Sequence, residues 1–347
     1  MEDVFLALVR AGLWGDFNEN ENQNENLFKG LDWDGVQKLA EEQSVLGLVA
    51  AGAEKLPTGI LPLTEKLILL CKCQLIEQRN VAMSRFTEAL VKKLQDAGIN
   101  VLLVKGQGIA QCYARPLWRT SGDIDLFFSK EDYPKGVELL SPLASKKMQD
   151  ARYTKSYGLT IDGWFIELHG TLRNSLSSKM DKVIDVVQKD TFDNGKVRIC
   201  RIGEADVMMP CANNDLFLVF AHFVRHFYKG GFSLRQLCDW CRLMWTYKDE
   251  IDVNVLEKRL RKAGIMTEWK AFAAVAVDYL GMPQEAVPLY DDSSKWHQKA
   301  EKILNHMFNP KNNKLSPAKV FPVNTIKFLP AILINVNSLK VKERLLA

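Results

Sequence analysis

The sequence predicts an α+β fold in which a small mixed sheet lies between helical regions at the two ends of the chain. Two observations predict it. Apolar residues recur with helical spacing over residues 1–97 and again over 211–347, whereas residues 98–210 contain short apolar runs, rich in β-branched residues and bounded by turn signals. We therefore expect an N-terminal helical region, an α/β core and a C-terminal helical domain with these boundaries.

The N-terminal region is expected to end in one long helix between Thr64 and Ala97. Apolar residues recur there near the 3.6-residue period, and Gly98 follows as a helix stop. Residues 32–56 show the same spacing. Helices are therefore expected along the chain up to the first strand of the core, except at the polar Asn- and Glu-rich residues 18–26, which are expected to form a flexible loop.

The core is expected to contain short buried strands and a hairpin. The pair Asp162-Gly163 between two extended runs is a strong hairpin signal, because both residues tolerate the left-handed backbone of a tight turn. In chain order we expect a strand over 99–106, a short helix from 106, a strand over 123–129, a helix over 130–144, the hairpin over 156–170 and a further strand over 196–203.

The helical period returns from Asn213, and Asn213 or Asn214 can cap the first helix of the C-terminal domain. The helices expected there cover residues 215–229, 233–248, 254–264, 267–281 and 295–307.

Composition indicates a globular protein without a strong excess of charge. The chain has 46 basic and 42 acidic residues, and the net charge of +4 is too small to indicate stable nucleic-acid binding or attraction to a membrane surface. No run of about 18 apolar residues predicts a membrane-spanning helix, and the acidic start lacks the cationic segment of a signal peptide. Seven scattered cysteines fit reduced thiols, so we expect a cytoplasmic protein.

Two carboxylates, one residue apart, mark the second strand. Alternate side chains of a strand share a face, so Asp123 and Asp125 are expected to point the same way while Ile124 points into the core. Carboxylates that close repel each other, and a divalent cation relieves the repulsion. Hard oxygen ligands favour Mg²⁺ or Mn²⁺, and Mg²⁺ usually shares them with substrate phosphates. Glu167, on the outward face of the hairpin strand, is the candidate third ligand.

A phosphate-binding turn is predicted where the first strand ends. Lys105-Gly106 stands between a strand and a helix, and the backbone N–H groups and the dipole at such a helix start favour an anion. Gly106 permits close approach of the backbone. Lys105, Arg119 and Ser121 are the side chains expected to bind phosphate oxygens around the metal. The combination predicts a phosphate-bearing substrate and in-line displacement at phosphorus.

These segments resemble the core of the DNA polymerase β-like nucleotidyltransferase superfamily, in which a glycine-led helix is followed by Asp-x-Asp on one strand and a third acid on a later strand. The closer resemblance is to a bacterial family of uncharacterised nucleotidyltransferases, and it covers roughly residues 30–280. The motifs that carry it are Lys105-Gly106, Tyr113-x-x-Pro116-x-x-Arg119, Asp123-Ile124-Asp125-Leu126, Glu167-Leu168-His169, His222 with His226, and Leu234-Arg235-x-Leu237-x-Asp239.

The resemblance implies Mg²⁺-dependent transfer of a nucleoside monophosphate from an NTP to a hydroxyl of a small molecule, a protein or an RNA end. It makes Asp123, Asp125 and Glu167 the metal ligands and catalytic residues. We count Gln107 among the NTP-binding candidates, although the superfamily usually has Gly or Ser at this position. The missing serine hydroxyl keeps an alternative open, namely a pseudoenzyme or regulatory partner that binds nucleotide without turnover.

Metal-dependent glycosyltransferases also use Asp-x-Asp, but they need a nucleotide-binding α/β half before the motif, and the chain upstream of Val101 is expected to be helical. His222 and His226 stand one helical turn apart and could share a ligand. No HExxH glutamate accompanies them, so packing beside the cleft is favoured over metal ligation.

Overall fold

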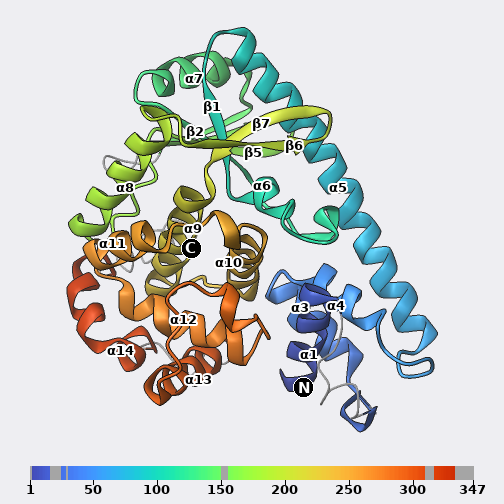
Figure 1. Cartoon of the computed structure of the whole chain (residues 1–347). Helices are drawn as coiled ribbons and strands as arrows, with labels where there is room; N and C mark the ends of the chain where they lie inside the picture. The colour runs from blue at the N-terminus through green and yellow to red at the C-terminus, as the bar shows by residue number, and fades with distance from the viewer. Residues whose placement is uncertain (1, 16–24, 29, 150–154, 309–315, 333–347) are drawn as a thin grey trace, which may run out of the picture.

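The computed structural model describes residues 2–15, 25–28, 30–149, 155–308 and 316–332. It confirms the α+β fold, with a small mixed sheet and helices on both sides of it along the chain (Figure 1).

The N-terminal helices are α1 (Glu2–Trp14), α3 (Trp33–Glu42), α4 (Leu46–Ala53) and α5 (Leu63–Asp96). The expected long helix is confirmed to within one residue at each end. Helix α5 belongs to two hydrophobic cores: Leu69 and Cys73 pack among the N-terminal helices, whereas Met83 and Leu90 pack against the sheet. It therefore joins the N-terminal helices to the sheet, as Figure 1 shows.

The sheet has five strands in the order β1-β2-β5-β4-β3. Strands β2 and β5 are parallel neighbours, and the other neighbouring pairs are antiparallel, so the sheet is mixed as expected. The strands are β1 (Val101–Val104), β2 (Ile124–Phe128), β3 (Lys146–Gln149), β4 (Ser156–Ile161) and β5 (Trp164–His169).

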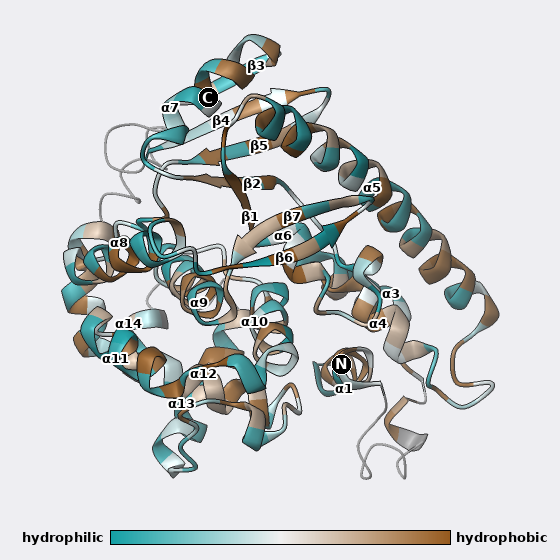
Figure 2. Cartoon of the chain, turned by 45° about the horizontal axis from the view of Figure 1, so that its top comes forward, coloured by the Kyte–Doolittle hydropathy of each residue, from teal (hydrophilic) through white to brown (hydrophobic). Residues whose placement is uncertain are grey.

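On one face of the sheet, strands β1, β2 and β5 are apolar. Alternate residues of β2 and β5, among them Ile124, Leu126, Ile166 and Leu168, pack in one core with α5 and with α7 (Asp132–Leu140). Figure 2 shows β1 and β2 as hydrophobic strands at the centre of the molecule. Because side chains alternate along a strand, the intervening residues Asp125 and Glu167 are directed to the opposite face.

The hairpin between β4 and β5 turns at the predicted pair. Asp162 and Gly163 both have positive φ, of 50° and 81°, as a two-residue turn of the primed type requires. The turn sets the register that pairs Gly158 with Glu167.

Two features of the core differ from the expectation. The strand expected over 196–203 is not part of the main sheet: it is β6 (Val197–Ile202), which pairs only with β7 (Ala205–Pro210) in a separate two-stranded sheet. The short helix expected from residue 106 is confirmed as α6 (Gly106–Ala110), which has five residues. Helix α8 (Ser178–Phe192) and strand β3 were not predicted. Edge strands and short elements are fixed by tertiary pairing, which local periodicity does not encode.

The C-terminal helices largely follow the predicted spans. They are α9 (Ala212–Lys229), α10 (Leu234–Thr246), α11 (Val253–Ala263), α12 (Met266–Asp278), α13 (Ser294–Phe308) and the short α14 (Ser316–Val320). Their core is aromatic: Phe220, Trp240 and Trp269 are fully buried, and their rings meet at centroid separations of 4.7–5.3 Å. This core packs α9 against α10.

Within the described part of the chain, no helix combines the length and the apolar character needed to cross a membrane.

Candidate functional site

The register of β2 and β5 brings two predicted acids together. The parallel pairing sets Asp125 opposite Glu167 and Phe127 opposite His169. Parallel strands lie about 4.8 Å apart, so directly opposed residues present their side chains side by side on one face. This is the face turned away from α5 and α7.

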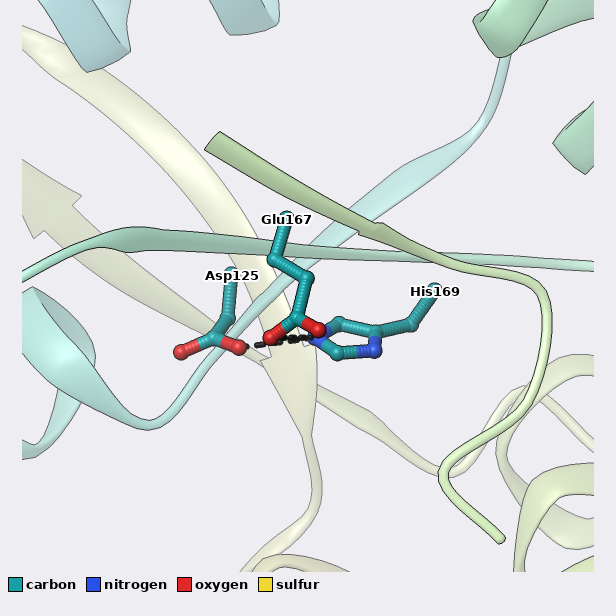
Figure 3. Close-up of side chains that lie close together, drawn as sticks. All are labelled: Asp125, Glu167 and His169. Atoms are coloured by element: carbon teal, nitrogen blue, oxygen red, sulfur yellow. Dashed lines mark hydrogen bonds and ion pairs between the residues drawn. The ribbon is translucent and has the colours of Figure 1, made fainter. Parts of the chain in front are cut away.

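His169 joins the two acids, and Figure 3 shows the three side chains converging. Its Nε2 lies 2.7 Å from Oδ1 of Asp125 and 3.4 Å from Oε2 of Glu167. Ser156 on β4 donates a hydrogen bond of 2.7 Å to Oε1 of Glu167 and holds that carboxylate in place. The sequence contained a signal for His169, since the Glu-x-His spacing on a strand places both residues on one face.

Asp123 lies in the loop directly before β2 and lines the same pocket as Asp125 and Glu167. Burial, followed by repulsion from Asp125, raises the pKa of the Asp123 carboxyl. All three acids proposed from the sequence therefore line one pocket, and Asp125 disfavours the ionised form of Asp123.

Lys105 neutralises Asp125. Its ammonium Nζ lies 2.8 Å from Oδ1 of Asp125, and its backbone φ of 58° is unusual for a residue other than glycine. Such strained conformations cluster at functional sites. Here Lys105 stands at the end of β1, immediately before Gly106.

The charges of this cluster depend on one another. Burial alone would raise the pKa of Asp125, but the Lys105 ammonium and the hydrogen bond from His169 hold it well below its usual range. Burial opposes the charge of Lys105, yet Asp125 and Glu167 raise its pKa. The buried carboxylate and the ammonium are thus both charged at neutral pH.

A pocket of about 320 Å³ opens over the acids. Its floor is the end of β1, the loop before β2 and Glu167, and its other wall is formed by α9 and the start of α10. Small-molecule sites enclose about 300–1,000 Å³, so the pocket has the size of a ligand site. His169 lines a smaller adjoining cavity that shares Lys105 and Glu167.

The donor set fits a divalent cation. Asp125, Glu167 and His169 each offer one ligand atom, and the three atoms lie within 4.8 Å of one another. Carboxylate oxygens suit Mg²⁺ and Mn²⁺, and an imidazole nitrogen is also a common metal ligand. Asp123 lines the same pocket from the loop before β2, and it is not part of this cluster of ligand atoms.

Comparison with known families decides the class of protein. The sequence profile of a family described as uncharacterised nucleotidyltransferases matches residues 29–281, which is more than half of the chain. The chain belongs to this family. Its members are placed among the nucleotidyltransferases, and that general class applies to this chain.

Two other comparisons add little to the family match. No curated protein matches the sequence. Among solved structures, an antigenic nucleotidyltransferase-like protein from Paracoccidioides brasiliensis matches with a TM-score of 0.30 and 11% identity. The match covers 60% of this chain and 92% of that one. A similarity of this size supports no statement about fold or function.

In this nucleotidyltransferase the two histidines noted in the sequence face the pocket. The rings of His222 and His226 on α9 have centroids 4.5 Å apart, and both line the wall opposite the acids. Burial, followed by the charge of Lys105, lowers the pKa of His222 well below its usual range. Burial and then the charge of Arg225 lower the pKa of His226 to about 4. Both rings are therefore neutral near pH 7.

Arg119 has a partner that the sequence analysis did not assign. Its guanidinium donates two hydrogen bonds, of 2.7 and 2.6 Å, to the carboxylate of Asp239 on α10, and Tyr113 donates a third, of 2.8 Å. Arg119 still lines the pocket, whereas Ser121 is buried behind it and accepts a hydrogen bond of 3.3 Å from Arg119. The Arg119–Asp239 ion pair connects the loop before β2 to the C-terminal helices.

The Gln107 side chain is directed away from the pocket. Its amide nitrogen donates to Ser84, and its amide oxygen accepts from Thr87, both on α5. The side chain is 5% exposed and does not line the pocket. The structure therefore does not bring Gln107 to the place where the sequence analysis expected a phosphate contact, because α5 offers it two hydrogen bonds inside the protein.

Proposed function

We propose that the chain is a metal-dependent nucleotidyltransferase of the polymerase β-like type, which moves a nucleoside monophosphate from an NTP to a hydroxyl acceptor. The observation that carries the proposal is the convergence of Asp125 and Glu167, from adjacent parallel strands, on a pocket that Asp123 also lines. Three acids around one pocket are costly unless positive charge compensates them.

Asp123, Asp125 and Glu167 are the proposed ligands of Mg²⁺ or Mn²⁺, with His169 beside them as a nitrogen donor or as the group that orients Asp125. The bound ion would neutralise charge on the phosphates and on the leaving oxygen. Lys105 already supplies one positive charge to the acids, and it is the proposed phosphate ligand once the cation takes its place beside Asp125.

In the proposed reaction the acceptor hydroxyl oxygen bonds to the α-phosphorus, and the bond from that phosphorus to the bridging oxygen breaks. Pyrophosphate leaves with the bonding electron pair, and the hydroxyl proton passes to a base. Glu167 is suited to this last role because it is only half-buried and reaches the pocket. Gly106 lines the pocket beside Lys105, where a phosphate could approach the backbone closely.

Incubation of the protein with each labelled NTP, in Mg²⁺ or Mn²⁺ and with cell extract as the acceptor source, tests the proposal. Asp125→Asn and Glu167→Gln should each abolish label transfer, and a chelator should do the same in the wild type until the metal is restored. Asp206→Asn changes an exposed carboxylate on β7 in the same chemical way and should leave transfer intact. Transfer that persists in both pocket variants would refute the proposed catalytic role.

A second candidate is nucleotide binding without turnover. The observation that favours it is the start of α6, where Gln107 is bonded to α5 and no serine hydroxyl is available. Calorimetry with ATP and Mg²⁺, run beside the transfer assay, distinguishes the two functions: this candidate predicts binding heat without any labelled product.

A further inference from the structure

Two arginines on the helical wall of the pocket form no ion pair within the described residues. Arg225 of α9 and Arg235 of α10 both line the pocket, opposite the acids. The Nε atom of each is buried and has no hydrogen-bond partner within the described residues. Arg235 Nη1 donates to the backbone oxygen of Thr120 at 2.7 Å, which fixes the position of its guanidinium.

The other cations of the pocket are already neutralised. Lys105 forms an ion pair with Asp125, and both oxygens of Asp239 accept hydrogen bonds from Arg119. Asp239 neutralises little of the charge of Arg235, because that carboxylate is shared with Arg119. Burial, followed by repulsion from Arg119, lowers the pKa of Arg235.

Positive charge thus accumulates on this wall. After burial, the charge of Lys105 across the pocket and then that of Arg225 lower the pKa of His222, whereas Arg225, Lys105 and Arg235 lower the pKa of His226. A partly buried cation without a counter-charge is destabilising, and both of these guanidinium groups line the pocket. A wall with two such cations is complementary to a ligand that carries several anionic oxygens.

The turn at Lys105-Gly106, on the opposite side of the pocket, offers fewer phosphate contacts than its sequence suggests. Helix α6 has only five residues, and Gln107 is bonded to α5 instead of facing the pocket. The acids stand on that side too, and they repel phosphate unless a cation lies between. The part of a nucleotide that carries most charge is therefore better accommodated by α9 and α10.

We propose that Arg225 and Arg235 clamp the β- and γ-phosphates of the NTP against the helical wall, while the acids serve the α-phosphate across the pocket. This inference rests on the proposed function for the identity of its ligand. The two arginines hold the group that leaves as pyrophosphate, so the helical domain takes part in nucleotide binding.

Calorimetric titration of the full chain with inorganic tripolyphosphate, without metal, tests the clamp. Arg225→Gln and Arg235→Gln should each weaken tripolyphosphate binding about tenfold to a hundredfold, the size expected for one charge-assisted contact. ATP should be weakened similarly, and AMP by less than about threefold, because AMP lacks the clamped phosphates. Arg261→Gln removes the same charge from an exposed site on α11, where Arg261 pairs with Glu257, and should leave all three affinities unchanged.

Thermal unfolding of each variant checks that the fold survives, and Arg225→Lys provides a second variant, which keeps the charge and should bind with intermediate affinity. Wild-type affinity for tripolyphosphate in both glutamine variants, or no binding by the wild type, would overturn the clamp. The proposed function is judged separately by label transfer. Tripolyphosphate binding that depends on both arginines, without any transfer, would retain the clamp and refute catalysis.

Discussion

The two aspartates of the Asp-Ile-Asp motif should respond in opposite ways to the same substitution. Asp125 is 3% exposed and accepts from Lys105 at 2.8 Å and from His169 at 2.7 Å. Asp125→Asn leaves the Lys105 ammonium buried without its counter-charge. Removing one partner of a buried ion pair costs about 3–5 kcal/mol, and because the asparagine still accepts hydrogen bonds we expect about 2–3 kcal/mol here.

Asp123→Asn should change the free energy of unfolding only slightly, and it should not lower it. The pKa of Asp123 is raised by burial and by Asp125, so its ionised form is a burden on the fold at neutral pH. Neutralising it removes the repulsion, and we expect the free energy of unfolding to stay the same or to rise by up to about 1 kcal/mol.

Urea unfolding at pH 7 with a chelator present, followed by tryptophan fluorescence, measures both effects. The pH dependence adds a check. The folded-state pKa of Asp125 lies below its unfolded value of 3.8, so its stabilisation is fully present above about pH 4 and is lost as the pH falls further. The difference between wild type and Asp125→Asn should therefore shrink below pH 4. An Asp125→Asn protein as stable as wild type at pH 7, or equal destabilisation by both substitutions, would refute this account of the site's charges.

Two more predictions concern the walls of the pocket. Asp239→Ala leaves the buried Arg119 and the Tyr113 hydroxyl without their acceptor, so it should lower the free energy of unfolding by about 3–5 kcal/mol in urea titrations. A loss below about 1 kcal/mol would show that the Arg119–Asp239 ion pair does not join the loop before β2 to α10. His226 has a folded-state pKa of about 4 against 6.5 unfolded, so the unfolded chain binds more protons between these values and stability falls as the pH drops. Between pH 7 and pH 4.5 the wild type should therefore lose about 2 kcal/mol more of its free energy of unfolding than His226→Gln does. An unchanged pH dependence in the variant would contradict a buried neutral ring.

The local elements were largely predictable because their signals are local. The long helix α5 and the turn at Asp162-Gly163 were predicted from periodicity and turn chemistry, and the structure confirms both. Strand β7 was missed, and its partner β6 was expected in the main sheet, since pairing between distant segments leaves no periodic trace. The division into units at residues 97/98 and 210/211 stays a prediction.

The sequence by itself determined which residues could form a site. Alternation along a strand sends Asp125 and Glu167 to the face opposite the core whatever the rest of the fold does, and the chemistry of paired carboxylates then calls for a cation. Those inferences need only the covalent geometry of a strand and the charges of the side chains.

Only the tertiary structure decided which partner each charged group has. It paired Lys105 with Asp125 and Arg119 with Asp239, and it turned Gln107 toward α5. It also left the Nε donors of Arg225 and Arg235 unpaired on the wall that faces the acids. The physical reason is that an ion pair or a buried hydrogen bond depends on distances of about 3 Å between segments far apart in the chain, and no local pattern in the sequence specifies such distances.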